Sequence, residues 1–207
     1  MNMAQSKLTL SQRKRLDILA AARSEYLEAG FRDTSMDRIA ERAQVSKRTV
    51  YNHFPSKEAL FKAIATQFMV DLRQAISVAY DPAKPLEDQL TEIARREVEQ
   101  VTQPDHIGMF RVFFTEVSNF SDAFDDIIEE TYRGEDPLEN WIDAAVADGR
   151  LSVEDSALAA AMFNSLLKGA LFWPQIAGYA KKRSKREKEA VISEAVHMFL
   201  AHYGRQR

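Results

Sequence analysis

Apolar residues recur along most of the chain at the three-to-four-residue spacing of an α-helix, and the alternation typical of strands is not sustained anywhere. The first such stripe runs through residues 11–29, with Ser11 as a candidate N-cap and Gly30 just beyond the end. The pattern predicts an all-α chain of about nine helices. Further helical segments, some of them short, are expected over residues 36–43, 47–53, 57–80, 86–102, 107–120, 122–132, 136–149, 155–173 and 187–203.

Two of these helices are short and adjacent, joined by a turn at residues 44–46. Thr34 followed by Asp37 resembles a capping box at the start of the first helix. Ala40 is the small residue that the crossing of the two helices requires, and Val50 is a suitable buried aliphatic residue in the second helix. The spacing predicts a helix-turn-helix.

The second short helix has a face suited to DNA. If Val50 points inward, a rotation of about 100° per residue turns Arg48 and Asn52 directly outward and leaves Thr49 and Tyr51 on the flanks. Arginine pairs with guanine and asparagine with adenine in a major groove, and hydroxyls reach phosphates. Lys47 and Lys57 add positive charge. The alternative interpretation is a solvated helix face with arbitrary polar residues.

Charge supports a division of the chain. The formal net charge is −3, but residues 1–60 carry +4 and residues 61–207 carry −7. The first part therefore suits an anionic partner, whereas the acidic remainder argues against indiscriminate binding to nucleic acid.

Several classes of protein are disfavoured by what the sequence lacks. The chain has no cysteine, which excludes disulfide scaffolds, thiolate nucleophiles and cysteine-type zinc fingers. The most apolar segment, residues 157–173, contains Asn164 and Lys168, so a buried helix is expected rather than a membrane span. Enzyme signatures such as HExxH or a P-loop are missing as well. We expect no enzymatic activity, no cofactor and no metal site, and a cytoplasmic location.

The first third of the chain resembles the N-terminal domain of TetR-type (tetracycline-repressor-like) transcriptional regulators. The resemblance rests on Ile18-Leu19-Ala20-Ala21-Ala22, Gly30-Phe31, Thr34-Ser35-Met36, Ile39-Ala40 and the run from Ala43 to Leu60. It implies a helical DNA-binding domain over residues 11–60 whose third helix enters the major groove. With the outward-facing set, the expected DNA contacts are Thr34, Ser35, Lys47, Arg48, Thr49, Tyr51, Asn52, His53 and Lys57.

Two positions depart from the family pattern. Gln44 occupies a turn position where glycine is common, so a positive φ there would be strained. Arg48 also replaces a common glycine, and its long cationic side chain is expected to change the base preference.

Residues 61–207 resemble more loosely the C-terminal region of AefR-like members of this family, notably at Phe113–Val117 and Gly149–Leu151. The resemblance implies a domain for dimerisation and effector binding. The helix over residues 155–173 is apolar nearly all round and needs burial on two sides, which favours a homodimer through the last two helices. The expected interface residues are Phe163, Leu167, Leu171, Val196, Phe199 and Tyr203.

A small-molecule pocket is expected in the same region. The phenylalanine stripe around residues 110–124 could line it or could form ordinary core, and Asn164 and Lys168 could be pocket groups or the solvent edge of their helix. The candidate pocket residues are Phe68, Phe110, Arg111, Phe113, Phe114, Val117, Asn164, Lys168 and Trp173.

The sequence thus predicts a sequence-specific, homodimeric DNA-binding regulator. We expect a repressor that a small-molecule effector releases from an approximately palindromic operator, with the helix from residue 57 as the lever between the two parts. One alternative is a DNA-binding protein without an effector. Another is an all-α small-molecule-binding or enzymatic module with a vestigial helix-turn-helix.

Overall fold

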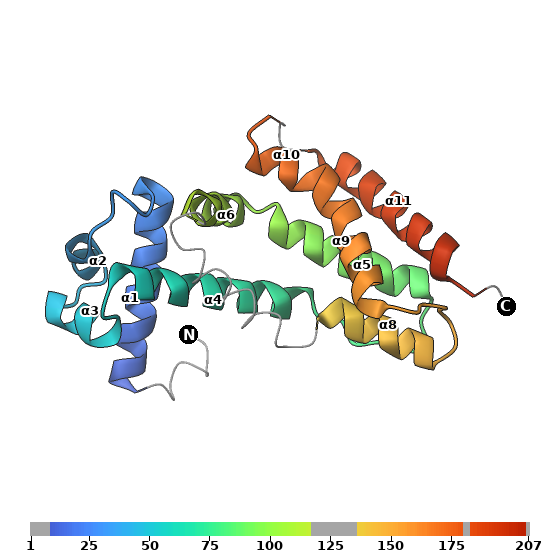
Figure 1. The fold of residues 1–207 in the computed structure, drawn as a ribbon, viewed down its shortest axis with the longest axis horizontal. Coiled ribbons are helices and arrows are strands. Elements are labelled where there is room, and N and C mark those ends of the chain that lie inside the picture. The colour runs from blue at the N-terminus through green and yellow to red at the C-terminus, as the bar shows by residue number, and fades with distance from the viewer. Residues whose placement is uncertain (1–8, 117–135, 180–182, 206–207) are drawn as a thin grey trace. The chain divides into compact units, whose positions relative to one another are not determined.

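The structure, a computed structural model, describes residues 9–116, 136–179 and 183–205 (Figure 1). These residues form ten helices and, instead of a strand, one β-bridge between Leu151 and Gly204. None of the helices in these ranges has the length and apolar character needed to cross a membrane. The helices are α1 (Leu10–Ala29), α2 (Met36–Arg42), α3 (Lys47–His53), α4 (Lys57–Ile76), α5 (Leu86–Val101), α6 (Pro104–Glu116), α8 (Pro137–Ala147), α9 (Ser156–Leu171), α10 (Trp173–Ile176) and α11 (Lys185–Tyr203).

The first of two structural units contains α1 to α3, α4 as far as Phe68, and α6 from Gly108 onward. Its centre is a cluster of aromatic rings, in which Tyr26, Phe31 and Phe61 contact one another at centroid distances of 4.9–5.9 Å. Phe113 of α6 joins this cluster 5.5 Å from Phe61. The unit therefore extends beyond the expected boundary at residue 60 and includes most of α6, which comes much later in the chain.

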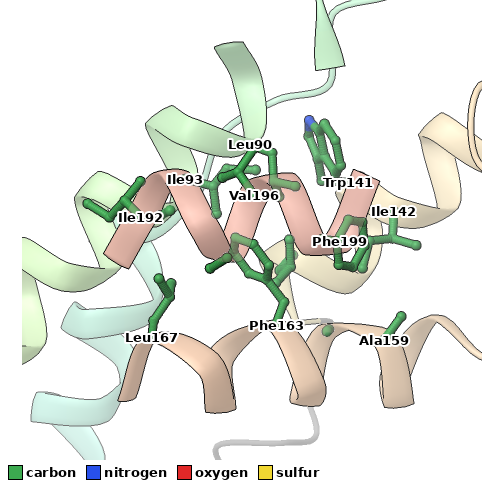
Figure 2. Packing of buried hydrophobic residues seen from close by; sticks show 14 of the residues in the cluster. Leu90, Ile93, Trp141, Ile142, Ala159, Phe163, Leu167, Ile192, Val196 and Phe199 are labelled. Atoms are coloured by element: carbon green, nitrogen blue, oxygen red, sulfur yellow. The ribbon is translucent and has the colours of Figure 1, made fainter. Parts of the chain in front are cut away.

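The second unit contains α5, α8, α9, α10 and α11, together with the end of α4. Its core is aliphatic and aromatic, with Trp141 and Ile142 of α8 packed among residues of α5, α9 and α11 (Figure 2). The indole N–H of Trp141 donates a hydrogen bond to Oε1 of Gln89, which satisfies a polar group in this interior.

The helix starts differ from the expected ones where a better cap is available. Thr9 caps α1 in place of Ser11, because Thr9 forms a reciprocal capping box with Gln12. Ser35 caps α2 in place of Thr34. The capping interpretation of Thr34 is therefore wrong.

Other boundaries moved in the second half of the chain. Helix α4 ends at Ile76 rather than near residue 80. Pro104 begins α6 instead of only ending the preceding segment, since proline is tolerated in the first turn of a helix. Helix α11 begins at Lys185, two residues early, because Ser184 and Glu187 form a capping box. The helix expected over residues 122–132 lies outside the described residues.

The six residues expected in the dimer interface belong largely to the core of the single chain. Phe163 and Leu167 of α9 point toward Val196 and Phe199 of α11 (Figure 2), and the rings of Phe163 and Phe199 lie 5.4 Å apart. Leu171 is buried and Tyr203 half-buried in the same cluster. Helix α9 has a second apolar side, with Leu158, Met162 and Leu166 exposed, and the expected interface residues of α9 lie on its buried side.

Candidate nucleic-acid interface

The turn between α2 and α3 fixes the geometry of the helix-turn-helix. The amide of Val45 donates to the carbonyl of Ala40, and the amide of Gln44 donates to that of Glu41. Gln44 has φ +55°, the left-handed region that glycine adopts without steric cost. Ser46 then caps α3 by accepting from the amide of Thr49 at 3.1 Å. The positive φ that the sequence prediction considered at Gln44 is therefore present, on a residue other than glycine.

Helix α3 presents the predicted outward face. Val50 and Phe54 are buried, at 0% and 3% exposure, and hold the inner side of the helix. Arg48, Tyr51 and Asn52 are exposed on the outer side. Thr49 is half-buried and its hydroxyl lies 2.8 Å from that of Ser46, and His53 is half-buried beside Phe54.

Lys47, the first residue of α3, is exposed but paired. Its ammonium lies 2.8 Å from Oδ1 of Asp37 in α2, and this hydrogen bond and charge raise the pKa of Lys47. Ser35 is exposed and caps α2. Both side chains stabilise the two short helices and remain at the surface.

Thr34 and Lys57 have structural partners instead. Thr34 is buried, and its hydroxyl donates to the carbonyl of Gly30 at 2.8 Å. The ammonium of Lys57 donates to the carbonyls of Phe31 and Thr34 at 2.9 and 3.0 Å, and to that of Arg32 at 3.3 Å. Because an ammonium has three N–H donors, this set occupies all of them. The structure thus places both residues in the attachment of the α1–α2 loop.

Glu25, which the sequence analysis did not single out, anchors α2 to α1. Its carboxylate is buried at 3% exposure and pairs with Arg38 at 2.9 Å and Arg42 at 2.7 Å. Helical spacing could have predicted its burial, because Glu25 lies seven residues after Ile18 on the same inward face of α1. A carboxylate on that face requires cationic partners, and α2 supplies them.

Of the phenylalanine stripe, the structure describes Phe110, Phe113 and Phe114 in α6, and Phe114 is 43% exposed. Phe113 is buried, Phe68 contacts both Phe110 and Phe113 at 5.2–5.5 Å, and Phe110 stacks near Phe114. These contacts place Phe113 in the core of the first unit and leave the role of Phe114 as core or pocket lining a prediction. Arg111 is exposed, and Val117 lies outside the described residues.

The remaining pocket candidates lie in the second unit. Lys168 on α9 pairs with Glu97 on α5 at 3.0 Å, and Glu97 is almost fully buried. Asn164 is half-buried one turn before Lys168. Trp173 is 47% exposed at the start of α10. The buried carboxylate of Glu97 was not anticipated from the sequence.

A cavity of about 890 Å³ opens between α5 and α11 of the second unit. Charged and polar side chains dominate its walls, and the candidate pocket residues are not among them. Its lining consists of Arg95, Val98, Glu99, Thr102, Gln103, Pro104, Lys185, Lys188, Glu189 and Ile192.

The outer side of α9 carries large apolar residues in solvent. Leu158 and Met162 are each 55% exposed, Leu166 is 38% exposed, and all three lie on one helical face. Met198 of α11 is 53% exposed. We call Leu158, Met162, Leu166 and Met198 the outer apolar face. Exposed apolar side chains that share one helical face, as on α9, are typical of a protein–protein contact.

Comparisons with known proteins agree with this architecture. Residues 18–64 match the family model described as bacterial regulatory proteins, tetR family. Residues 88–205, more than half of the chain, match the AefR-like transcriptional repressor, C-terminal domain. The chain belongs to the TetR family. Members of this family are helix-turn-helix transcriptional regulators rather than enzymes, and they typically act as repressors that respond to effectors.

Individual TetR-family relatives extend the similarity over nearly the whole chain. A crystal structure of a regulator from Pseudomonas syringae pv. tomato str. DC3000 is 37% identical, covers 96% of this chain and 100% of that one, and has a TM-score of 0.78. The flavonoid-responsive regulator FrrA is 28% identical, with 94% and 99% coverage and a TM-score of 0.76.

The similarity to curated sequences is confined to a shorter segment. The HTH-type transcriptional regulator YhgD of Bacillus subtilis (strain 168) is 37% identical over 76 residues, which are 37% of this chain. The chain spans 39% of the length of that relative. The match therefore bears on only part of the protein.

Proposed function

We propose that this TetR-family protein is a transcriptional repressor that reads an operator with the outer face of α3. The observation that carries the proposal is the exposure of Arg48, Tyr51 and Asn52 over the buried Val50 and Phe54. Arginine and asparagine make bidentate contacts to guanine and adenine, and a tyrosine hydroxyl reaches a phosphate. We include Thr49, His53, Lys47 and Ser35 at the edge of this surface. Thr34 and Lys57 lie outside this surface in our proposal, because their polar atoms are engaged within the protein.

The test is selection of bound duplexes from a fragmented genomic library at about 0.1 M salt with competitor DNA. A small set of fragments that share a palindrome is expected for the wild type. Arg48→Ala should cost about 1–3 kcal/mol and relax the preference at one base position of each half-site. Arg186→Ala removes an equally exposed cation from α11 and should leave the preference unchanged. Uniform, salt-sensitive recovery of all fragments by the wild type would contradict the proposal.

We also propose that two copies associate through the outer apolar face. Removing Leu158, Met162 and Met198 from water is favourable by about 25 cal/mol per Å² of apolar area. Ala161, Ser165 and the glycine at position 169 lie beside the large residues on α9, and small side chains allow two helices to approach closely. A two-fold dimer of this kind would present two α3 helices to the two halves of a palindrome.

We propose that the second unit binds the effector. The pair of Glu97 and Lys168 supports this proposal, because it brings a nearly fully buried carboxylate to Lys168, one of the candidate pocket residues, and a buried ion pair is weak evidence for stability. FrrA is named as flavonoid-responsive. By analogy, we propose an aromatic effector with hydroxyl groups, which would donate hydrogen bonds to the carboxylate of Glu97.

Release from DNA distinguishes this proposal from a DNA-binding protein without an effector. A flavonoid such as naringenin, added to the complex with the selected operator, should lower the affinity of the wild type and have less effect on Glu97→Gln. For scale, a 100-fold loss of affinity requires about 2.7 kcal/mol of coupling.

Because its proposed partner is genomic DNA, we propose that the protein acts in the cytoplasm.

A further inference from the structure

The N-terminal part of α1 carries an unusual concentration of positive charge. Arg13, Lys14 and Arg15 follow one another directly, and the first turn of α1 contains no acidic residue. Cations near a helix N-terminus oppose the helix dipole, so this arrangement is unfavourable for α1 in isolation. An anionic partner bound to these side chains would make their electrostatic interactions favourable.

Arg15 connects this basic segment with the recognition helix. Its guanidinium lies over the ring of Phe54, 4.6 Å from the centroid, and Phe54 is the C-cap of α3. The ring is buried and the arginine is exposed, so the contact fixes the start of α1 beside the end of α3 while the charge stays in solvent. Figure 1 shows these two segments side by side within the first unit.

The distances favour phosphates over bases as the target. Helix α3 spans Lys47–His53, so at 1.5 Å per residue it is about 10 Å long. A major groove is about 12 Å wide. Arg15 is held at the end of α3 rather than on its outward face, so when that face lies in the groove the cation lies at the margin of the contact, where phosphates border the groove.

We infer that Lys14 and Arg15 form a second DNA contact, to the phosphate backbone beside the groove that α3 occupies. Helix geometry sets Arg13 apart from this contact, because two positions correspond to about 200° and turn it away from Arg15. Lys14 is half-buried and lies between the two. The inference rests on the proposed function, since it needs α3 to lie in a major groove.

The experiment uses the full-length protein and the duplex that it selects from the library. Arg15→Gln and Lys14→Gln are compared with the wild type, with Arg13→Gln as the matched control of equal charge on the opposite side of α1. Each loss of a phosphate contact lowers the slope of log affinity against log salt by about 0.9, so two copies in a dimer should lower it by about 2. Affinity at about 0.1 M salt should fall roughly three- to tenfold for all operator sequences alike.

Ethylation interference locates the contact. The wild type should be blocked by ethylation of particular phosphates beside each half-site, and these signals should disappear in Lys14→Gln and Arg15→Gln but persist in Arg13→Gln. Thermal unfolding shows whether a variant has lost its fold rather than its DNA contact. Arg15→Gln also removes the contact with the ring of Phe54, so Lys14→Gln tests the charge alone. Arg15→Lys keeps the positive charge and should keep most of the DNA contact.

Unchanged salt slopes and interference patterns in both variants, with a wild type that selects its operator, would overturn the inference and leave the proposed function standing. A wild type that selects no sequence would overturn both.

Discussion

Single residues in the turn of the helix-turn-helix carry a backbone cost that the sequence only partly reveals. Gln44 is the one non-glycine residue with positive φ among those that the structure describes. Its neighbours prevent relaxation, because the amides of Gln44 and Val45 both donate to carbonyls of α2. The sequence suggests this cost only by comparison with the glycine that is common at this position in the family. A non-glycine residue in the left-handed conformation costs about 1–2 kcal/mol, because its Cβ lies too close to the following carbonyl oxygen.

This strain can be measured by substitution. Gln44→Gly should change the free energy of unfolding by less than about 1 kcal/mol, because relief of the strain is offset by greater freedom of the unfolded chain. Gln44→Val should destabilise the protein by about 1–2 kcal/mol, since a β-branched residue tolerates positive φ poorly. Urea unfolding is the measurement, and Gln74→Val on α4 is the control, with an expected cost of a few tenths of a kcal/mol. Equal losses at the two sites would contradict the strain.

At the scale of elements, the short helices depend on side chains from their neighbours. Helices of this length are not stable in isolation. Helix α2 is attached to α1 by Glu25 through Arg38 and Arg42, and the start of α4 is attached to the α1–α2 loop by Lys57. The sequence predicted where α2, α3 and α4 lie, but it assigned Lys57 to DNA, because a lysine near the recognition helix is typical of both roles.

Lys57→Met tests which role dominates. The variant keeps much of the apolar stem but loses the three bonds to carbonyls, so the free energy of unfolding should fall by about 1–3 kcal/mol. The slope of operator affinity against salt should stay that of the wild type, because no phosphate contact is lost. Lys84→Met, an exposed lysine between α4 and α5, should leave both quantities unchanged. A flatter slope with normal stability would return Lys57 to the DNA contacts.

At the scale of the whole molecule, α9 serves two surfaces. Its inner side holds Phe163 and Leu167 in the core with α11, and its outer side holds Leu158 and Met162 in solvent. Periodicity recognised that this helix is apolar nearly all round. It could not tell which side meets the same chain, because both sides have the same chemistry.

Substitutions on the two sides should therefore differ in kind. Met162→Glu should give a helical, folded monomer. In a two-fold interface each subunit would bury one unpaired carboxylate, and the cost of removing both from water would prevent association. Phe163→Glu should lose more than about 3 kcal/mol of stability, because it removes a buried ring and buries a carboxylate. Light scattering and circular dichroism distinguish these outcomes, and Thr91→Glu on α5 should remain dimeric. A dimer in Met162→Glu would place the interface elsewhere.

The sequence by itself determined the all-helical class, the helix-turn-helix and the outward face of α3, because these follow from local periodicity, capping and the fixed rotation per residue. It also determined the family, through residues at fixed spacing. Only the tertiary structure decided that α6 packs with the DNA-binding helices, that Thr34 and Lys57 serve the α1–α2 loop, that Glu97 is buried beside Lys168, and which side of α9 lies in the core. These outcomes depend on contacts between residues far apart in the chain, and such contacts leave no periodic signal in the sequence.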